Sequence, residues 1–132
     1  MQAGFAINLA NFLQREEMYV KAAKKFSGNI LIMEVSGELD HHSAANLKAE
    51  IETELKKGVV RHIVLNLEGL SFMDSSGLGV LLGRYKELGK WQGRMLAFGL
   101  QPVVEKLFRL TGLNKLIPIH IDLESCLKEL RG

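Results

Sequence analysis

Residues 61–88, RHIVLNLEGLSFMDSSGLGVLLGRYKEL, decide the fold of this chain. The run Ile-Val-Leu at 63–65 is short and apolar throughout, which is typical of a central strand covered on both faces. After a turn, the apolar residues between 75 and 88 recur at the spacing of one side of a helix. A buried strand followed by an amphipathic helix predicts an α/β architecture.

The rest of the chain alternates between the same two kinds of element. Parallel strands need long crossover connections, usually helices, and these crossovers are right-handed. The order of elements therefore predicts one compact, mostly parallel sheet preceded by a β-hairpin. The further elements are expected as hairpin strands over 18–26 and 29–39, helices over 40–57, 102–112 and 122–130, and strands over 94–98 and 116–121.

Length and composition favour one ordinary soluble domain. The chain has 132 residues, of which 47% are apolar and 24% are charged. Lys and Arg exceed Asp and Glu by 17 − 15 = 2, and no basic run concentrates this small excess. The balance disfavours a nucleic acid as partner, because phosphate backbones are bound by clustered positive charge.

Residues 1–17 are expected to form an amino-terminal extension before a domain over residues 18–132. Phe5, Leu9, Phe12 and Leu13 fall at helical spacing and predict a short amphipathic helix. No Lys or Arg occurs among the first 14 residues, unlike in a secretory signal or a basic membrane anchor. No run approaches the roughly 20 apolar residues that span a bilayer, so we expect a cytoplasmic protein without membrane contact.

Cysteine and histidine residues offer little chemistry. Cys126 is the only cysteine, so no internal disulfide can form, and its apolar setting predicts a buried structural thiol in a reducing compartment. His41 and His42 are adjacent but lack a third ligand at metal spacing, so no metal site is expected. His62 and His120 are expected to be hydrogen-bonded structural residues.

The segment LSFMDSSGLG at 70–79 joins the buried strand to the helix, where α/β folds usually place their binding sites. Ser75 can cap that helix, with its hydroxyl among free backbone N–H groups at the positive end of the helix dipole. Asp and Ser also dominate ordinary helix starts and turns. From the residues alone, a purely structural role for Asp74, Ser75 and Ser76 stays open.

Catalytic and phosphate-binding patterns fail in this segment. A nucleophile elbow needs glycine two residues before its serine, and Met73 occupies that position before Ser75. The glycines at 77, 79 and 83 lie within the helix and are not followed by the Lys-Ser or Lys-Thr of a phosphate loop. A small serine hydrolase would need a histidine and an acid to converge on Ser75, and no spacing identifies them.

Four stretches of the sequence carry a resemblance to a known family: GELDHH at 37–42, RHIVLNL at 61–67, LSFMDSSGLGVLLGRYK at 70–86 and LFRLTGL at 107–113. With them the chain resembles the anti-sigma factor antagonists of the STAS family, and most closely the sporulation type that regulates sigma factor F. The resemblance spans about residues 18–131 and leaves the extension outside it. It implies a single STAS-like domain with its helices packed mainly on one side of the sheet.

The resemblance also implies a function. In this family the unphosphorylated protein binds an anti-sigma factor that is also a serine kinase, and so releases a sigma factor to regulate transcription. The kinase uses ATP and Mg²⁺ to phosphorylate the first serine of Asp-Ser-Ser-Gly, which is Ser75 here. A serine phosphatase restores the active form. This partner-switching protein is then neither an enzyme nor the holder of a cofactor.

The same resemblance assigns roles to the residues around Ser75. Asp40 resembles the family's partner-facing acid, Asp74 and Ser76 are expected to shape the loop, and Gly77 to let the kinase approach the backbone. The expected partner-binding residues are Asp40, His41, His42, Asp74, Ser76 and Gly77. Two alternatives stay open, a STAS scaffold in a stress-sensing assembly and a nucleotide-binding STAS domain.

Overall fold

The computed structural model describes residues 21–132. The helix predicted in the amino-terminal extension and residues 18–20 of the predicted hairpin lie outside the described residues. The elements, in chain order, are β1 (Lys21–Ser27), β2 (Ile30–Leu39), α2 (Ala44–Lys56), β3 (His62–Asn66), β4 (Leu70–Met73), α3 (Ser75–Gly89), β5 (Met95–Phe98), α4 (Pro102–Thr111), α5 (Leu113–Leu116), β6 (Ile119–His120) and α6 (Leu123–Arg131).

The strands form one sheet in the order β1-β2-β3-β5-β6, with β4 paired to β2. β1 and β2 form an antiparallel hairpin, and all the other pairs are parallel. β2 is long enough to pair with β3 through residues 30–34 and with β4 through residues 37–39. The predicted hairpin and mostly parallel sheet are confirmed.

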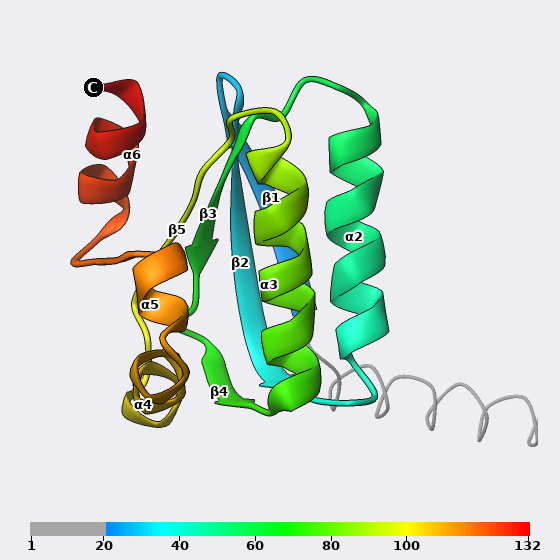
Figure 1. Cartoon of the computed structure of the whole chain (residues 1–132), viewed down its shortest axis with the longest axis vertical. Coiled ribbons are helices and arrows are strands. Elements are labelled where there is room, and N and C mark those ends of the chain that lie inside the picture. The colour runs from blue at the N-terminus through cyan, green and yellow to red at the C-terminus, as the bar shows by residue number, and fades with distance from the viewer. Residues whose placement is uncertain (1–20) are drawn as a thin grey trace, which may run out of the picture.

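Helices cover the two faces of the sheet unequally. Figure 1 shows α2 and α3 side by side across one face, and Leu47 of α2, Leu81 of α3 and Phe108 of α4 are fully buried in the core beneath. α6 covers the other face, where a smaller core surrounds Cys126. Burial raises the pKa of the Cys126 thiol to about 11, which suits the structural role predicted for it.

β3 explains why the apolar run at 63–65 is continuous. Successive side chains of a strand point to opposite faces. Ile63 and Leu65 therefore enter the larger core and Val64 the smaller one, and each is 0% exposed. The prediction of a central strand covered on both faces is confirmed.

The last predicted strand is longer than the one that the structure shows. The strand expected over 116–121 is reduced to Ile119–His120, because Leu116 is the last residue of the short helix α5. Gly112 adopts a left-handed conformation with φ of 77°, which ends α4 and lets α5 begin at once. Pro118 lacks a backbone N–H, so it cannot donate to the sheet as a regular strand residue would.

β4 lies inside the segment that the sequence suggests is only a turn. Its buried residues, Leu70 and Met73, are three positions apart and so do not show the alternation that indicates a strand. The strand is stabilised from outside, by pairing with the end of β2. This contact between distant segments has no local signature in the sequence.

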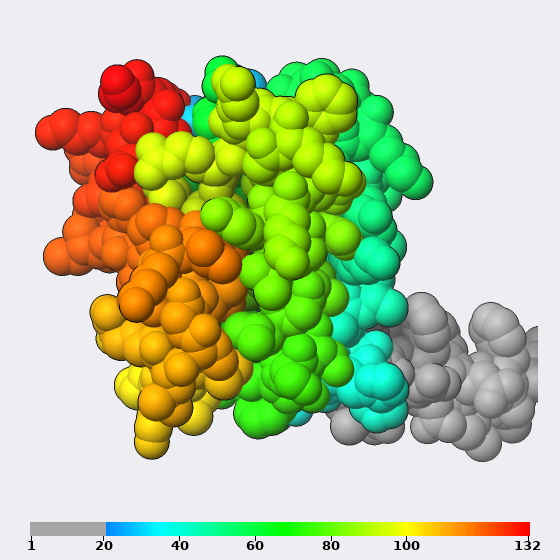
Figure 2. Space-filling view, in the orientation of Figure 1, coloured from blue at the N-terminus to red at the C-terminus, as the bar shows by residue number. Residues whose placement is uncertain are grey.

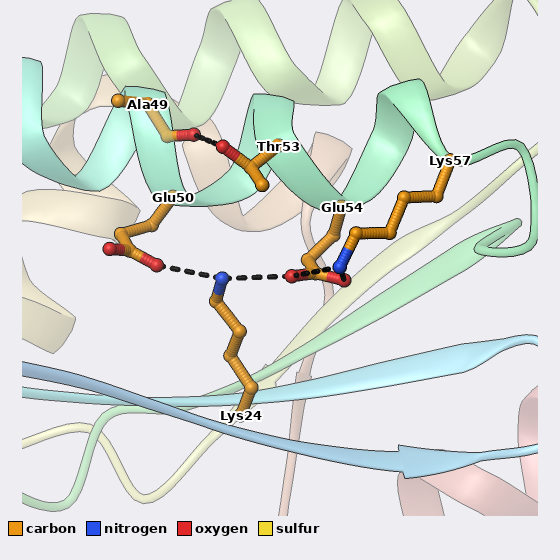
Figure 3. A network of polar contacts seen from close by, with 6 residues as sticks. All are labelled: Lys24, Ala49, Glu50, Thr53, Glu54 and Lys57. Atoms are coloured by element: carbon orange, nitrogen blue, oxygen red, sulfur yellow. Dashed lines mark hydrogen bonds and ion pairs between the residues drawn. The ribbon is translucent and has the colours of Figure 1, made fainter.

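As charged residues of a predicted helix, Glu50, Glu52 and Glu54 are expected from the sequence to form a solvated face, and the structure contradicts this for Glu54. Glu54 is only 5% exposed. Figure 3 shows the Lys24 ammonium of β1 between two of these carboxylates, 2.7 Å from Glu50 Oε2 and 2.9 Å from Glu54 Oε2. Lys57 Nζ lies 3.2 Å from Glu54 Oε1, so this buried carboxylate is paired twice. The network fastens α2 to the edge strand.

This network predicts how stability depends on pH. Donation from Lys24, and then from Lys57, holds the pKa of Glu54 below its ordinary value of 4.5. A lowered carboxyl pKa adds stability above the ordinary value, and this stability is lost as the pH falls through the folded-state pKa. Glu54→Gln should therefore melt at a lower temperature than wild type at pH 7, with the gap closing as the pH falls below the ordinary value of 4.5 and through the lowered pKa of Glu54. A gap that stays constant in thermal unfolding between pH 7 and pH 3 would contradict this explanation.

Candidate functional site

The candidate site lies at the edge of the sheet where β2 and β4 end. Leu39 and Met73 are paired in parallel register, so Asp40 and Asp74 leave the sheet side by side. The Asp74 N–H donates to the Leu39 carbonyl over 3.1 Å and ties the two exits together. Sequence positions more than 30 residues apart thus form one surface, at the lower edge of the sheet in Figure 1.

Asp74, and not Ser75, caps α3. Asp74 has an extended backbone, and its Oδ1 accepts from the Ser76 N–H over 2.8 Å and from the Gly77 N–H over 3.3 Å. The negative carboxylate here also interacts favourably with the positive end of the helix dipole. The expectation that Ser75 caps the helix is therefore wrong, and the amides of Ser76 and Gly77 are already occupied.

Ser75 is the first residue of α3, and its side chain is exposed. The two residues that flank it, Asp74 and Ser76, are half-buried. The local backbone is fixed by the cap, by the bond to Leu39 and by the first turn of the helix. The site therefore presents one accessible hydroxyl on a rigid support, which another enzyme could reach.

Asp40 organises a tight turn before α2. Its Oδ1 accepts from the His42 N–H over 2.9 Å and from the Ser43 N–H over 3.1 Å. Donation from the Ser43 amide holds the pKa of Asp40 below its ordinary value, so the carboxylate is charged at neutral pH. The helix predicted to start at Asp40 begins instead at Ala44, because residues 40–43 form this turn.

Ser43, which the sequence offers with Asp40 as a cap for α2, stabilises the turn instead and makes no side-chain cap hydrogen bond to the helix. It is 0% exposed, and its Oγ accepts from the Asp40 N–H over 2.9 Å and donates to the Glu38 carbonyl over 2.7 Å. His41 and His42 are exposed on the outside of the same turn, with ring centroids 5.7 Å apart. The spacing of Asp40 and Ser43 is the signal that indicates such a side-chain-stabilised turn.

Gly77 faces the interior rather than a partner. A Cβ at this position would lie 2.7 Å from Leu39 Cγ, 2.7 Å from Met73 Cγ and 2.8 Å from the Leu39 carbonyl oxygen. The structure assigns Gly77 to the close approach of α3 to the ends of β2 and β4. The resemblance implies that Gly77 lets a kinase approach the backbone, which stays a prediction. The contact that the structure shows is the internal one, to Leu39 and Met73.

Phe72 is an exposed aromatic residue beside the site that sequence reasoning missed. It lies on β4 two residues before Asp74 and is 43% exposed. Large exposed apolar side chains beside a polar site are frequent in protein interfaces. Phe72 lies between the two buried positions of β4, Leu70 and Met73. Its exposure could therefore be predicted only once β4 is recognised as a strand.

The geometry gives no support to metal or hydrolase chemistry. Among residues 21–132, no group of three His, Cys, Asp or Glu side chains could hold a metal ion. No hydrogen bond joins Ser75 Oγ to a histidine in this part of the chain. His62 lies on β3 and accepts from the Arg94 N–H at Nδ1 over 2.9 Å, the structural role expected of it. No helix of the described residues is long and apolar enough to cross a bilayer.

Comparison with known proteins relates this chain to a regulatory family. The STAS domain family model matches residues 21–126. The chain is 42% identical over 101 residues to the anti-sigma F factor antagonist of Paenibacillus polymyxa, covering 76% of this chain and 86% of that protein. It also matches the structure of unphosphorylated SpoIIAA, an anti-sigma factor antagonist, with 34% identity and a TM-score of 0.75 over 85% of this chain and 97% of that one.

SpoIIAA has also been solved in a phosphorylated form. That structure, of the Bacillus cell fate determinant, matches this chain with 32% identity and a TM-score of 0.67, and covers 83% of this chain and 99% of the other. Both forms share the fold described above.

Proposed function

The chain belongs to the STAS domain family, and on this premise we propose that it is an anti-sigma factor antagonist that phosphorylation of Ser75 switches off. In its unphosphorylated form it binds an anti-sigma factor, as the names of its relatives indicate. That binding frees a sigma factor and so regulates transcription, and the resemblance to the sporulation type implies that this happens in sporulation. The interaction surface is the edge that carries Asp40, Asp74 and Ser75.

The observation that carries this proposal is the accessible Ser75 hydroxyl beside an occupied cap. Phosphorylation adds about −1.5 to −2 charges at neutral pH. Free amides at a helix start can bind such an anion. Here Asp74 already accepts from Ser76 and Gly77, so the helix start has fewer amides to offer the phosphate. The added charge therefore stays at the surface that a partner would contact.

Two carboxylates make this surface sensitive to further negative charge. Asp40 and Asp74 flank the same edge of the sheet, and Asp40 is held in its charged form. A phosphate on Ser75 would add to both charges within a small area. A closely fitted partner would have to remove water from this group, which is costly without compensating cations. Repulsion among these negative charges and the cost of removing water from the phosphate together dissociate the complex, while the fold is unchanged.

The same scheme implies which enzymes add and remove the phosphate. The anti-sigma factor is also the serine kinase, and it supplies ATP and Mg²⁺ from its own site. A serine phosphatase removes the phosphate. In this scheme the chain itself is a ligand of one protein and a substrate of two enzymes, and it performs no chemistry of its own.

Phosphorylation measured by intact mass tests the proposal. After incubation with its cognate anti-sigma factor and ATP, the wild-type chain should gain the mass of one phosphate, and Ser75→Ala should gain none. Ser76→Ala is the matched control, because Ser76 is the neighbouring serine and is half-buried. It should still be phosphorylated. A phosphate that persists in Ser75→Ala and disappears in Ser76→Ala would place the switch on Ser76 and contradict the assignment.

A further inference from the structure

Two neighbouring hollows, which share Leu116 as a lining residue, follow α3 away from Ser75. The lower part, of about 80 Å³, is lined by Leu78 and Leu82 of α3, by Thr111 of α4, and by Leu113 and Leu116 of α5. The upper part, of about 500 Å³, is lined further along α3 by Tyr85, Lys86 and Gly89. We call the two parts together the α3–α5 groove. It follows the boundary between the green surface of α3 and the orange surface of α5 in Figure 2.

The two parts of the groove differ in chemistry. The lower part is lined almost entirely by leucines. The upper part is lined by three cations, Lys86, Arg94 and Lys115, and by no acidic residue from the described range 21–132. Arg94 is partly neutralised by Glu129, 3.0 Å away. Lys86 and Lys115 are exposed and form no ion pair with any residue of the part that the structure describes.

The groove begins on α3 close to the proposed switch residue, Ser75. Leu78 is one helical turn beyond Ser75 on α3, and Gly89 ends the same helix. From Leu78 to Gly89 the helix rises about 16 Å, at about 1.5 Å per residue. A partner that contacts Ser75 could therefore extend one segment along α3 through the whole groove.

From this arrangement we infer that the α3–α5 groove binds an acidic segment of the anti-sigma factor. The segment places an apolar side chain against the leucines nearest Ser75 and carboxylates against Lys86 and Lys115. The inference rests on the proposed function, because it assigns a second contact to the same partner. This contact adds affinity at a place that the phosphate on Ser75 does not reach. It also guides the partner to the switch through long-range attraction between the lysines and the acidic segment.

Charge reversal at the two unpaired lysines tests the inference. In its unphosphorylated form, Lys86→Glu/Lys115→Glu should bind the anti-sigma factor about tenfold more weakly than wild type at about 0.1 M salt, measured by isothermal titration calorimetry. At about 1 M salt, where charges are screened beyond about 3 Å, the gap should close. The purified cognate anti-sigma factor is the probe.

The chain offers a matched control. Lys56→Glu/Lys128→Glu changes the net charge by the same amount, and each of these lysines also lies in the last turn of its helix. Lys86 and Lys115 occupy the equivalent last turns of α3 and α5, so any loss of favourable helix-dipole interaction is similar in both variants. The control should bind as wild type does. Circular dichroism and thermal unfolding check that both variants are folded.

The outcomes separate this inference from the proposed function. If the wild-type chain binds and the phosphate on Ser75 abolishes binding, but Lys86→Glu/Lys115→Glu binds as tightly as wild type, the groove is not the contact. An equal loss in both double variants would show a general effect of net charge and would also overturn the inference. If the wild-type chain binds no anti-sigma factor, the proposed function fails, and the inference fails with it.

Discussion

Phosphorylation of Ser75 should weaken binding to the anti-sigma factor more than a hundredfold. A contact free energy of about 3 kcal/mol corresponds to a factor of that size. The phosphate adds roughly −1.5 to −2 charges beside Asp40 and Asp74. Because Asp74 occupies the nearest helix amides, the charge lies where the partner must approach. The dissociation constant of the chain phosphorylated at Ser75, measured by calorimetry, checks this expectation.

Ser75→Glu and Ser75→Ala complete this experiment. Glutamate brings one charge instead of nearly two, so Ser75→Glu should lose less affinity than the phosphorylated chain, and Ser75→Ala should bind as wild type does. Ser125→Glu is a matched control, because Ser125 lies in the first turn of α6, whose cap, Asp122, also accepts from a backbone amide. It should bind normally. Equal affinities of the phosphorylated and unphosphorylated chains would refute the switch.

Gly77→Ala should destabilise the fold by about 1–3 kcal/mol, the usual cost of overpacking a filled core. The new Cβ would meet the side chains of Leu39 and Met73 at 2.7 Å and the Leu39 carbonyl oxygen at 2.8 Å. Side-chain carbons can move aside, but the Leu39 carbonyl also accepts the Asp74 N–H and is fixed by it. Denaturant unfolding, with the midpoint and slope fitted separately, measures this loss.

Gly79→Ala is the control for this prediction and should have the opposite sign. Gly79 lies two residues further along α3 and is exposed. Among the residues that the structure describes, nothing beyond its own stretch of helix lies within 4 Å of the position that a methyl group would take. Alanine is favoured over glycine in a helix interior by about 1 kcal/mol. Gly79→Ala should therefore stabilise the chain. If both variants were stabilised, the close approach of α3 to β2 and β4 would not be as tight as the structure has it.

The position of Gly77 also links stability to the switch. Gly77 donates its N–H to Asp74 and packs on Leu39, the residue before Asp40. A shift of α3 by a larger side chain would move Ser75 relative to Asp40. We therefore expect Gly77→Ala to lose affinity for the partner as well as stability, whereas Gly79→Ala changes stability alone.

The sequence alone predicts the class of fold, and its resemblance to a known family indicates Ser75 as the proposed switch. The continuous apolar run at 63–65 predicts a buried central strand, and the helical spacing after Ser75 predicts α3, because burial on both faces and a period of 3.6 residues leave direct traces in the order of residues. Asp74, Ser75 and Ser76 are adjacent in the chain, so their grouping needs no tertiary information.

Only the tertiary structure decides which residues surround Ser75, which glutamate of α2 is buried and where a groove forms along α3. The pairing of β4 with β2 joins Asp40 to Asp74, the burial of Glu54 follows from a lysine on β1, and the α3–α5 groove joins cations from three segments. Each depends on contacts between residues far apart in the chain. Local propensities act over a few residues, so they cannot encode such contacts, which arise when packed elements bury their shared surfaces.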